Sequence, residues 1–319
     1  MFPAAEASPR RAPSGSRAGT AAGLAAVVIW GMAPVATRAL VLQLAPLPLL
    51  VIRMGVAAVV LLPWCGPMLR RPGRRYIPRL VIAGLLGMVG YNLPVTIGLQ
   101  WVPASTAGLV LASEPIWLLL LAAVFLGERV SRRCWAGAAV ALAGVALLAG
   151  PGVLSSRSSR GSAGELAGVS LIVLGTLLFA AYTLVLRPAS RACGPVPATA
   201  ASTVAGSLFY AAFAGTVSPA QLGRLPAAAW GELAFLAVGS IVVGMLAWNL
   251  AVARLPGQRA SLLLYLEPLV SVAGAMVLLG ERLSADLAAG GALVLGGIAA
   301  TWMPGPRERR KYSASTPAP

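Results

Sequence analysis

Long apolar runs separated by short polar segments cover most of the chain. From Thr20 to Trp302 these runs follow one another, and each ends at Pro, Gly or basic residues. A run of about 20 apolar residues is long enough to cross the hydrocarbon core of a bilayer as a helix. The positions of these Pro, Gly and basic residues predict ten transmembrane helices, over residues 20–41, 47–64, 77–99, 104–126, 133–150, 166–187, 196–216, 231–253, 258–279 and 284–303.

The chain contains an internal repeat. Residues 113–148 return as residues 266–301 at a constant offset of 153, and 15 of the 36 aligned positions are identical. The shared positions include a Glu-Pro pair, a Gly-Glu-Arg triplet and a serine two residues after the triplet. A repeat made of apolar helices is typical of transporters built from duplicated halves.

The basic residues indicate how the helices are oriented. With the N-terminus in the cytoplasm, cytoplasmic segments hold 19 basic residues and the opposite side holds 4, as the positive-inside rule requires. Five helices in each half then make the second half enter the membrane inverted. The predicted fold is an all-α integral membrane protein, with ten transmembrane helices arranged as two inverted five-helix repeats.

The domain organisation follows from the same pattern. Two five-helix repeats are joined by a polar linker and flanked by tails rich in Pro, Ser and Arg, which we expect to be disordered and cytoplasmic. The predicted segments are the tail 1–19, the first repeat 20–150, the linker 151–165, the second repeat 166–303 and the tail 304–319.

Composition excludes several function classes. The chain is 58% hydrophobic and 11% charged, which is too few charges to cover a water-exposed surface. The net charge of +16 resides mainly in short loops between apolar spans, so it indicates topology rather than nucleic-acid binding. The chain has no histidine, and its three cysteines lack metal-ligand spacing. We therefore expect no metal, no cofactor and no Ser-His-Asp catalysis.

The two glutamates of the repeat are the first candidates for function. Glu114 and Glu267 each lie near the middle of a predicted span, where a carboxylate is costly unless it is protonated, paired or facing a wet cavity. One interpretation is a pair that binds a cationic or amine-bearing solute or exchanges a proton. The other is a structural pair, protonated and hydrogen-bonded to backbone that Pro115 and Pro268 leave unpaired.

The prolines also predict a helix break in both spans. In lipid, such a break is tolerated only where it is buried in protein or borders a cavity. Both interpretations therefore place the fourth and ninth spans at the centre of the bundle.

By contrast, the Gly-Glu-Arg triplets are expected to lie in loops, with Ser131 and Ser284 capping the next helices. A glycine stripe on each of those helices predicts close packing, at Gly137, Gly144, Gly290 and Gly297.

Further polar and aromatic residues lie inside the apolar spans. A mid-membrane asparagine needs a partner in the bundle or a cavity, and aromatic rings can bind an organic cation. The alternative for each aromatic ring is core packing or an interfacial belt. The candidate lining residues are Trp30, Tyr91, Asn92, Tyr182, Trp248, Asn249 and Tyr265. Arg53 has two interpretations of its own: snorkelling to the interface, or pairing with a carboxylate.

The chain resembles the EamA-like branch of the drug/metabolite transporter superfamily. The resemblance rests on the segment VPASTAGLVLASEP, the repeated LGER with its following serine, and the Gly-rich fifth and tenth spans, and it covers about residues 20–303. It implies a permease of the cytoplasmic membrane, in many relatives an exporter of amino acids, other metabolites or toxic compounds, often thought to exchange with protons. Small multidrug relatives use a glutamate in their first helix. The first and sixth spans here have no acidic residue, so that role does not transfer.

The predicted function is that of a transmembrane transporter, not an enzyme. It would export a small metabolite or drug-like solute by alternating access, with proton exchange as the hypothesis for coupling. The alternatives are an integral-membrane enzyme and a non-transporting membrane protein. The expected partners are the solute and the lipid bilayer, without nucleic acid, and a homodimer is left open. We expect a multi-pass protein of the inner (cytoplasmic) membrane, with both termini in the cytoplasm.

Overall fold

The computed structural model describes residues 15–70, 73–127, 131–148, 161–255 and 263–302. The termini, most of the predicted linker and Glu128-Arg129 lie outside these residues. Throughout the described part the secondary structure is helical, without strands. The helices of the first half are α1 (Gly15–Val41), α2 (Pro46–Leu61), η1 (Leu62–Cys65), α3 (Gly66–Leu69), η2 (Gly73–Tyr76), α4 (Ile77–Gly84), η3 (Leu85–Tyr91), α5 (Asn92–Gly98), α6 (Ala104–Leu111), α7 (Glu114–Leu126) and α8 (Arg132–Leu148).

The second half continues in the same way. Its helices are α9 (Gly161–Cys193), α10 (Pro195–Ala211), η5 (Ala214–Thr216), α11 (Pro219–Leu222), α12 (Ala227–Ala234), η6 (Phe235–Val243), α13 (Gly244–Arg254), α15 (Glu267–Leu279) and α16 (Ala285–Trp302). Most helices lie where the apolar runs predict them. Helices α1 and α9 start about five residues earlier than the sequence pattern suggests, because the polar residues before each span continue the helix beyond its apolar part.

Six helical segments in the described residues are long and apolar enough to cross a membrane, judged by length and composition. They are Arg17–Val41, Pro46–Leu69, Gly73–Gly98, Ala104–Phe125, Ala163–Cys193 and Ala227–Ala251, and Glu267–Leu279 and Ala285–Ala300 are shorter apolar helices. Many large apolar side chains are exposed on the outside, and Val59, Phe125 and Val277 are each more than 70% exposed. Such a surface is suited to lipid rather than to water.

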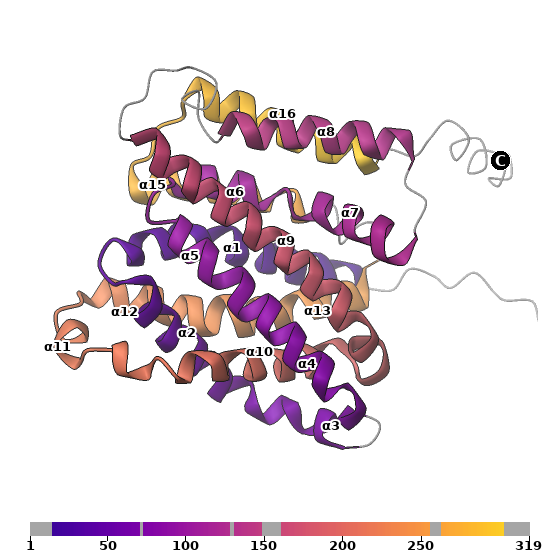
Figure 1. The fold of residues 1–319 in the computed structure, drawn as a ribbon, viewed down its shortest axis with the longest axis vertical. Coiled ribbons are helices and arrows are strands. Elements are labelled where there is room, and N and C mark those ends of the chain that lie inside the picture. Colours follow the sequence, from indigo (N-terminus) through magenta and orange to yellow (C-terminus); the bar gives the residue numbers. More distant parts are fainter. Residues whose placement is uncertain (1–14, 71–72, 128–130, 149–160, 256–262, 303–319) are drawn as a thin grey trace, which may run out of the picture.

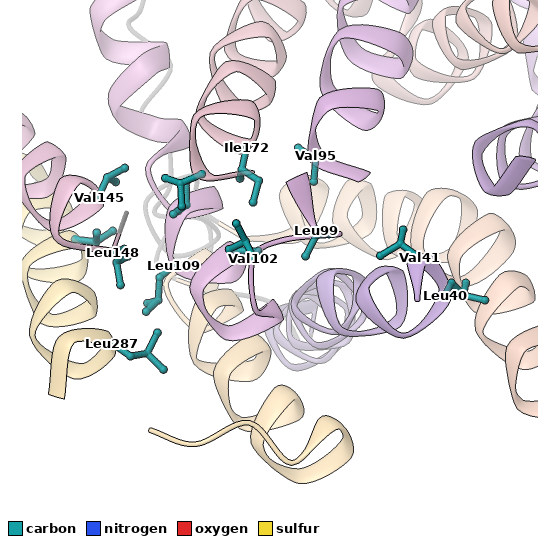
Figure 2. Packing of buried hydrophobic residues seen from close by; sticks show 14 of the residues in the cluster. Leu40, Val41, Val95, Leu99, Val102, Leu109, Val145, Leu148, Ile172 and Leu287 are labelled. Carbon is teal, nitrogen blue, oxygen red and sulfur yellow. The ribbon is translucent and has the colours of Figure 1, made fainter. Parts of the chain in front are cut away.

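The bundle has a dense apolar core and one distinct edge. Helices α8 and α16 lie side by side at that edge (Figure 1). The largest core cluster joins residues from both halves, among them Leu99, Leu109, Leu148 and Leu287 (Figure 2). Core residues from distant parts of the sequence therefore bury one another, and the halves form a single packed unit.

Glycines allow the closest helix crossings. A Cβ atom on Gly144 would lie 2.7 Å from the carbonyl oxygen of Gly290, and one on Gly297 would lie 2.5 Å from that of Gly137. Both distances are shorter than van der Waals contact, so only glycine fits at these positions. The glycine stripes predicted to serve close packing are thus at the interface of α8 and α16, and the structure adds that these two helices pack against each other.

Two spans contain a π-helical segment in the middle. These segments, η3 and η6, occupy the same place in the third and eighth predicted spans. Wider helical turns leave carbonyl groups that need other donors, and in a membrane those donors must come from the protein. The Tyr210 hydroxyl donates to the Met88 carbonyl at 2.9 Å, and the Trp30 indole donates to the Ser240 carbonyl at 3.0 Å.

Candidate functional site

The Glu-Pro pairs stand at equivalent helix breaks. Helix α6 ends at Leu111, and the Ser113 amide donates to the Val110 carbonyl at 3.0 Å before α7 starts at Glu114. In the second copy the Leu266 amide donates to the Leu263 carbonyl at 3.0 Å before α15 starts at Glu267. Proline as the second residue of a helix loses no helical hydrogen bond, so each break costs little.

Each glutamate is the first residue of a helix. A carboxylate at this position lies at the positive end of the helix dipole, next to amide groups without helical acceptors. This position partly offsets the cost of keeping charge in an apolar bundle. Both side chains are half-buried. Helix α7 packs against α9, and α15 packs against α1 and α6.

The fold brings the two glutamates together with Tyr91. Glu114 interacts electrostatically with Glu267, and the Tyr91 hydroxyl interacts electrostatically with both carboxylates. Within the described part of the chain, no hydrogen bond or ion pair joins either carboxylate to another residue. Two neighbouring acids without a fixed partner repel each other when both are charged, and a cation or a bound proton relieves that repulsion. This arrangement can therefore bind a cationic group or protons.

Two tryptophans lie beside this region. The rings of Trp30 on α1 and Trp248 on α13 have centroids 5.7 Å apart and are tilted by 51°. The next residue after Trp30 is Gly31, and a Cβ atom there would lie 2.7 Å from the Glu267 carbonyl oxygen. Trp30 thus lies on the helix that contacts the start of α15, and Trp248 on α13 packs against it.

Tyr91 and Tyr182 have different environments. Tyr91 packs against Phe179 with ring centroids 4.8 Å apart, and Phe179 packs against Tyr182 at 5.1 Å. Tyr182 is 6% exposed and belongs to an apolar cluster with Tyr76 and Leu80. The structure thus groups Tyr91 with the glutamates and Tyr182 with the apolar core. Phe179, which joins the two, was not among the candidates from the sequence, because an aromatic residue in an apolar span gives no distinguishing signal.

Both asparagines use their amides inside their own helical spans. The Asn92 amide donates to the Gly87 carbonyl at 3.0 Å, and the Asn249 amide donates to the Met245 carbonyl at 2.8 Å. The first bond reaches back five residues, into the π-helical segment η3. The Tyr265 hydroxyl lies 3.5 Å from the Ile298 carbonyl oxygen of α16. These three side chains have backbone neighbours, and their contact with a solute stays a prediction.

Capping residues hold the segments after the breaks. Gly127 and Gly280 end α7 and α15 with φ of +64° and +67°, a conformation that glycine adopts without strain. Ser131 accepts a hydrogen bond from the Cys134 amide, and Ser284 accepts one from the Leu287 amide, at 3.2 and 3.1 Å. The predicted serine caps are confirmed.

Glu281 has a role that its sequence position did not reveal. Its carboxylate accepts hydrogen bonds from the backbone amides of Ala104 and Ser105 at 2.7 and 3.0 Å, and a third from the Ser105 hydroxyl. Glu281 therefore caps α6, a helix of the other half of the chain. Its counterpart Glu128 lies outside the described residues.

Comparisons with known proteins agree with this architecture. The model of the EamA-like transporter family matches residues 17–150 and 166–303. A Streptantibioticus cattleyicolor protein named "Probable terminal-alkyne amino-acid exporter" is 33% identical over 77% of this chain and 80% of its own length. A protein of Archaeoglobus fulgidus named "Uncharacterized transporter" is 27% identical over 85% of this chain and 94% of its own length.

A solved crystal structure has the same fold. It aligns with a TM-score of 0.61 over 92% of this chain and 99% of that chain, at 22% identity. The matched segments contain the apolar helices, so the protein is a multi-pass membrane protein. The family match covers both halves of the chain, and the chain belongs to the EamA-like transporter family.

Proposed function

We propose that this protein exports a small metabolite or drug-like solute by alternating access, in exchange for protons. The observation that carries the proposal is the pair of Glu114 and Glu267, which start equivalent helices from the two halves and interact with each other. Carboxylates are costly in a bundle of this composition and mark solute or proton pathways in membrane proteins. The glutamate pair binds either the amine of the solute or protons, so solute and protons compete for the pair.

The helix contacts support two inverted repeats. Helix α1 packs against α13 and α15, while α9, its counterpart, packs against α5 and α7. When the halves are exchanged, the contact of α1 with α13 corresponds to that of α9 with α5, and the contact of α1 with α15 corresponds to that of α9 with α7. The remaining contacts, of α2 with α10 and of α8 with α16, each join a helix to its own counterpart in the other half. A two-fold relation between the halves gives this pattern. We infer ten membrane helices around such an axis, so that the halves exchange roles as the site faces one side and then the other.

Proton exchange follows from the properties of two close acids. With the site open to the cytoplasm, the charged pair attracts an amine-bearing solute. With the site open outside, protons neutralise the pair, the attraction falls and the solute leaves. This cycle uses the orientation that the basic loops predict, with both termini in the cytoplasm. The name of the Streptantibioticus cattleyicolor relative supports amino acids as the first solutes to test.

Purified protein in liposomes tests the proposal. Vesicles are loaded with labelled amino acids and, separately, with lipophilic organic cations, and loss of label is followed under an imposed proton gradient. We expect wild-type protein to release at least one solute faster than empty vesicles do. Glu114→Gln and Glu267→Gln should each slow this release by about tenfold or more, because each removes one charge of the pair. The control is Asp286→Asn, which removes an exposed carboxylate on α16.

Two results would contradict the proposal. One is wild-type protein that moves none of these solutes although it is folded and oriented in the membrane. The other is release that is unchanged in both glutamine variants and in the double variant. The second result would leave transport in place and would remove the glutamates from it.

A further inference from the structure

Arg53 is a buried arginine in the middle of α2. Its side chain is 8% exposed, and its neighbours on the helix, Leu50 and Met54, are fully buried. Helix α2 packs against α10 and η6, so the guanidinium lies inside the bundle and does not reach the interface. The snorkelling interpretation from the sequence is therefore wrong.

The second interpretation required a carboxylate, and the described residues do not supply one to the guanidinium. Among the residues that the structure describes, no acidic side chain forms an ion pair with Arg53, and its Nε atom is enclosed without a hydrogen-bond acceptor. Arginine stays charged in proteins, and an uncompensated buried charge costs several kcal/mol. A cost of this size requires a partner that the described residues do not supply.

The other arginine inside a span shows that the fold can supply acceptors. The guanidinium of Arg38 on α1 donates to the Leu99 carbonyl, at the end of α5. Both arginines come from the first half, and both lie within predicted spans. The described part of the fold thus supplies an acceptor to one arginine and none to the Nε atom of the other.

The groups around Arg53 connect it to the glutamate pair. Arg53 interacts electrostatically with Tyr91 and Tyr210, and Tyr91 also interacts with Glu114 and Glu267. Tyr210 is positioned by its own hydrogen bond, from its hydroxyl to the Met88 carbonyl. Tyr91 therefore lies within electrostatic range of a positive group and of two acids. Side chains of opposite charge thus lie around Tyr91.

We propose that Arg53 binds the carboxylate of the transported solute, while Glu114 and Glu267 take its amine. The inference rests on the proposed transport function and adds to it a specificity-determining residue. The guanidinium fork matches a carboxylate with two parallel hydrogen bonds, and such charge-assisted bonds are strong in an apolar environment. In this arrangement Tyr91, which interacts with Arg53 and with both glutamates, contacts the zwitterionic solute.

The first experiment uses wild-type protein alone. Liposomes are loaded with each of the twenty amino acids or with its α-amide, at a pH at which the amines of both compounds are charged. The amide keeps the amine and the side chain and loses only the negative charge. We expect the amino acid to leave at least about tenfold faster than its amide, since the hydrogen bonds to a charged acceptor are lost. Equal rates for the acid and the amide would overturn the inference.

The second experiment changes the arginine. Arg53→Gln should slow release of the amino acid to the rate of its amide and leave the amide rate unchanged. Arg53→Lys, which keeps the charge but not the fork, should give an intermediate amino-acid rate. Arg224→Gln, at an exposed arginine outside the predicted spans, is the control and should behave as wild type. A purely structural arginine would instead lower both rates together, and that result would also overturn the inference.

The two proposals fail in different ways. If wild-type protein releases neither amino acids nor organic cations, the transport function fails, and this inference fails with it. If wild-type protein releases amines or organic cations but does not distinguish acid from amide, transport stands and only the role of Arg53 is lost. The wild-type comparison needs no variant, so a misfolded Arg53→Gln protein does not prevent the test.

Discussion

Glu281 accepts a hydrogen bond from the backbone amide of Ala104 at 2.7 Å, across 177 positions of sequence. The same carboxylate accepts from the Ser105 amide at 3.0 Å. These are free amide groups at the start of α6, and a carboxylate there is also favoured by the helix dipole. The loop after α15 is thus fixed to the start of the broken fourth span.

Removing this cap should destabilise the protein. We expect Glu281→Ala to lower the free energy of unfolding by about 1–2 kcal/mol, the usual cost of losing a helix N-cap. Glu281→Gln keeps one acceptor oxygen and should lose less. The melting temperature of the purified protein in detergent measures both effects. The neighbouring variant Arg282→Gln changes an exposed charge in the same loop and should leave the melting temperature unchanged. A Glu281→Ala protein as stable as wild type would show that the cap contributes nothing.

Two adjacent glycines of α16 should respond in opposite ways to alanine. A Cβ atom on Gly297 would meet the Gly137 carbonyl oxygen and the Ala141 amide nitrogen at 2.5 Å, and both are backbone atoms that cannot turn aside. We expect Gly297→Ala to cost about 1–3 kcal/mol by overpacking. A Cβ atom on Gly296 would have no atom within 4 Å beyond the adjacent residues and backbone of its own helix, and alanine favours a helix more than glycine does. Gly296→Ala should therefore be neutral or stabilising.

Melting temperatures in detergent and in lipid nanodiscs measure this pair of variants. The two substitutions add the same methyl group to the same helix, so any difference between them comes from the contact with α8. Equal melting temperatures would mean that α8 and α16 do not pack as closely as the structure describes.

Much of the helical framework could be predicted from the sequence. Apolar length defines a span, and Pro, Gly and basic residues mark its ends, because both depend on local chemistry. Ser131 and Ser284 were likewise predictable as caps, since each bonds an amide only three residues away. The glycine stripes indicated an interface, as their spacing places them on one helix face.

Contacts between distant segments could not be predicted. Nothing near Glu281 in the sequence indicates that it caps α6, because the partner is set by how α15 and α6 pack. The π-helical segments η3 and η6 were also missed, since their sequences are ordinary apolar runs and the wider turns depend on donors such as Tyr210. The isolation of Arg53 from every described carboxylate likewise became visible only in three dimensions.

The indole of Trp30 should stabilise the contact between α1 and η6. Its hydrogen bond to the Ser240 carbonyl serves a group in a π-helical turn. We expect Trp30→Phe, which keeps a ring but no donor, to cost about 1 kcal/mol. Trp135, which is 49% exposed on α8, provides the matched control. Trp135→Phe should leave the melting temperature unchanged, and a similar loss in both variants would exclude the hydrogen bond as the cause.

The three cysteines provide a test of membrane orientation. The charge pattern predicts that Cys65, Cys134 and Cys193 lie at cytoplasmic span ends or in cytoplasmic loops. In the structure only Cys65 is buried, at 7% exposure. A maleimide that cannot cross membranes should label Cys134 and Cys193 in inside-out vesicles and neither of them in right-side-out vesicles. Cys65 should react only after denaturation, because its thiol is enclosed by the bundle.

A cysteine on the opposite face completes the topology test. Gln221 lies on α11, in the exposed connection between α10 and α12, which the charge pattern places outside the cell. In a protein whose own cysteines are replaced by alanine, Gln221→Cys should be labelled in right-side-out vesicles and protected in inside-out vesicles. Labelling of Gln221→Cys and Cys134 from the same side would contradict the orientation, because the two positions then could not lie on opposite faces of the membrane. The inverted arrangement of the two halves would fail with it, since that arrangement depends on an odd number of spans in each half.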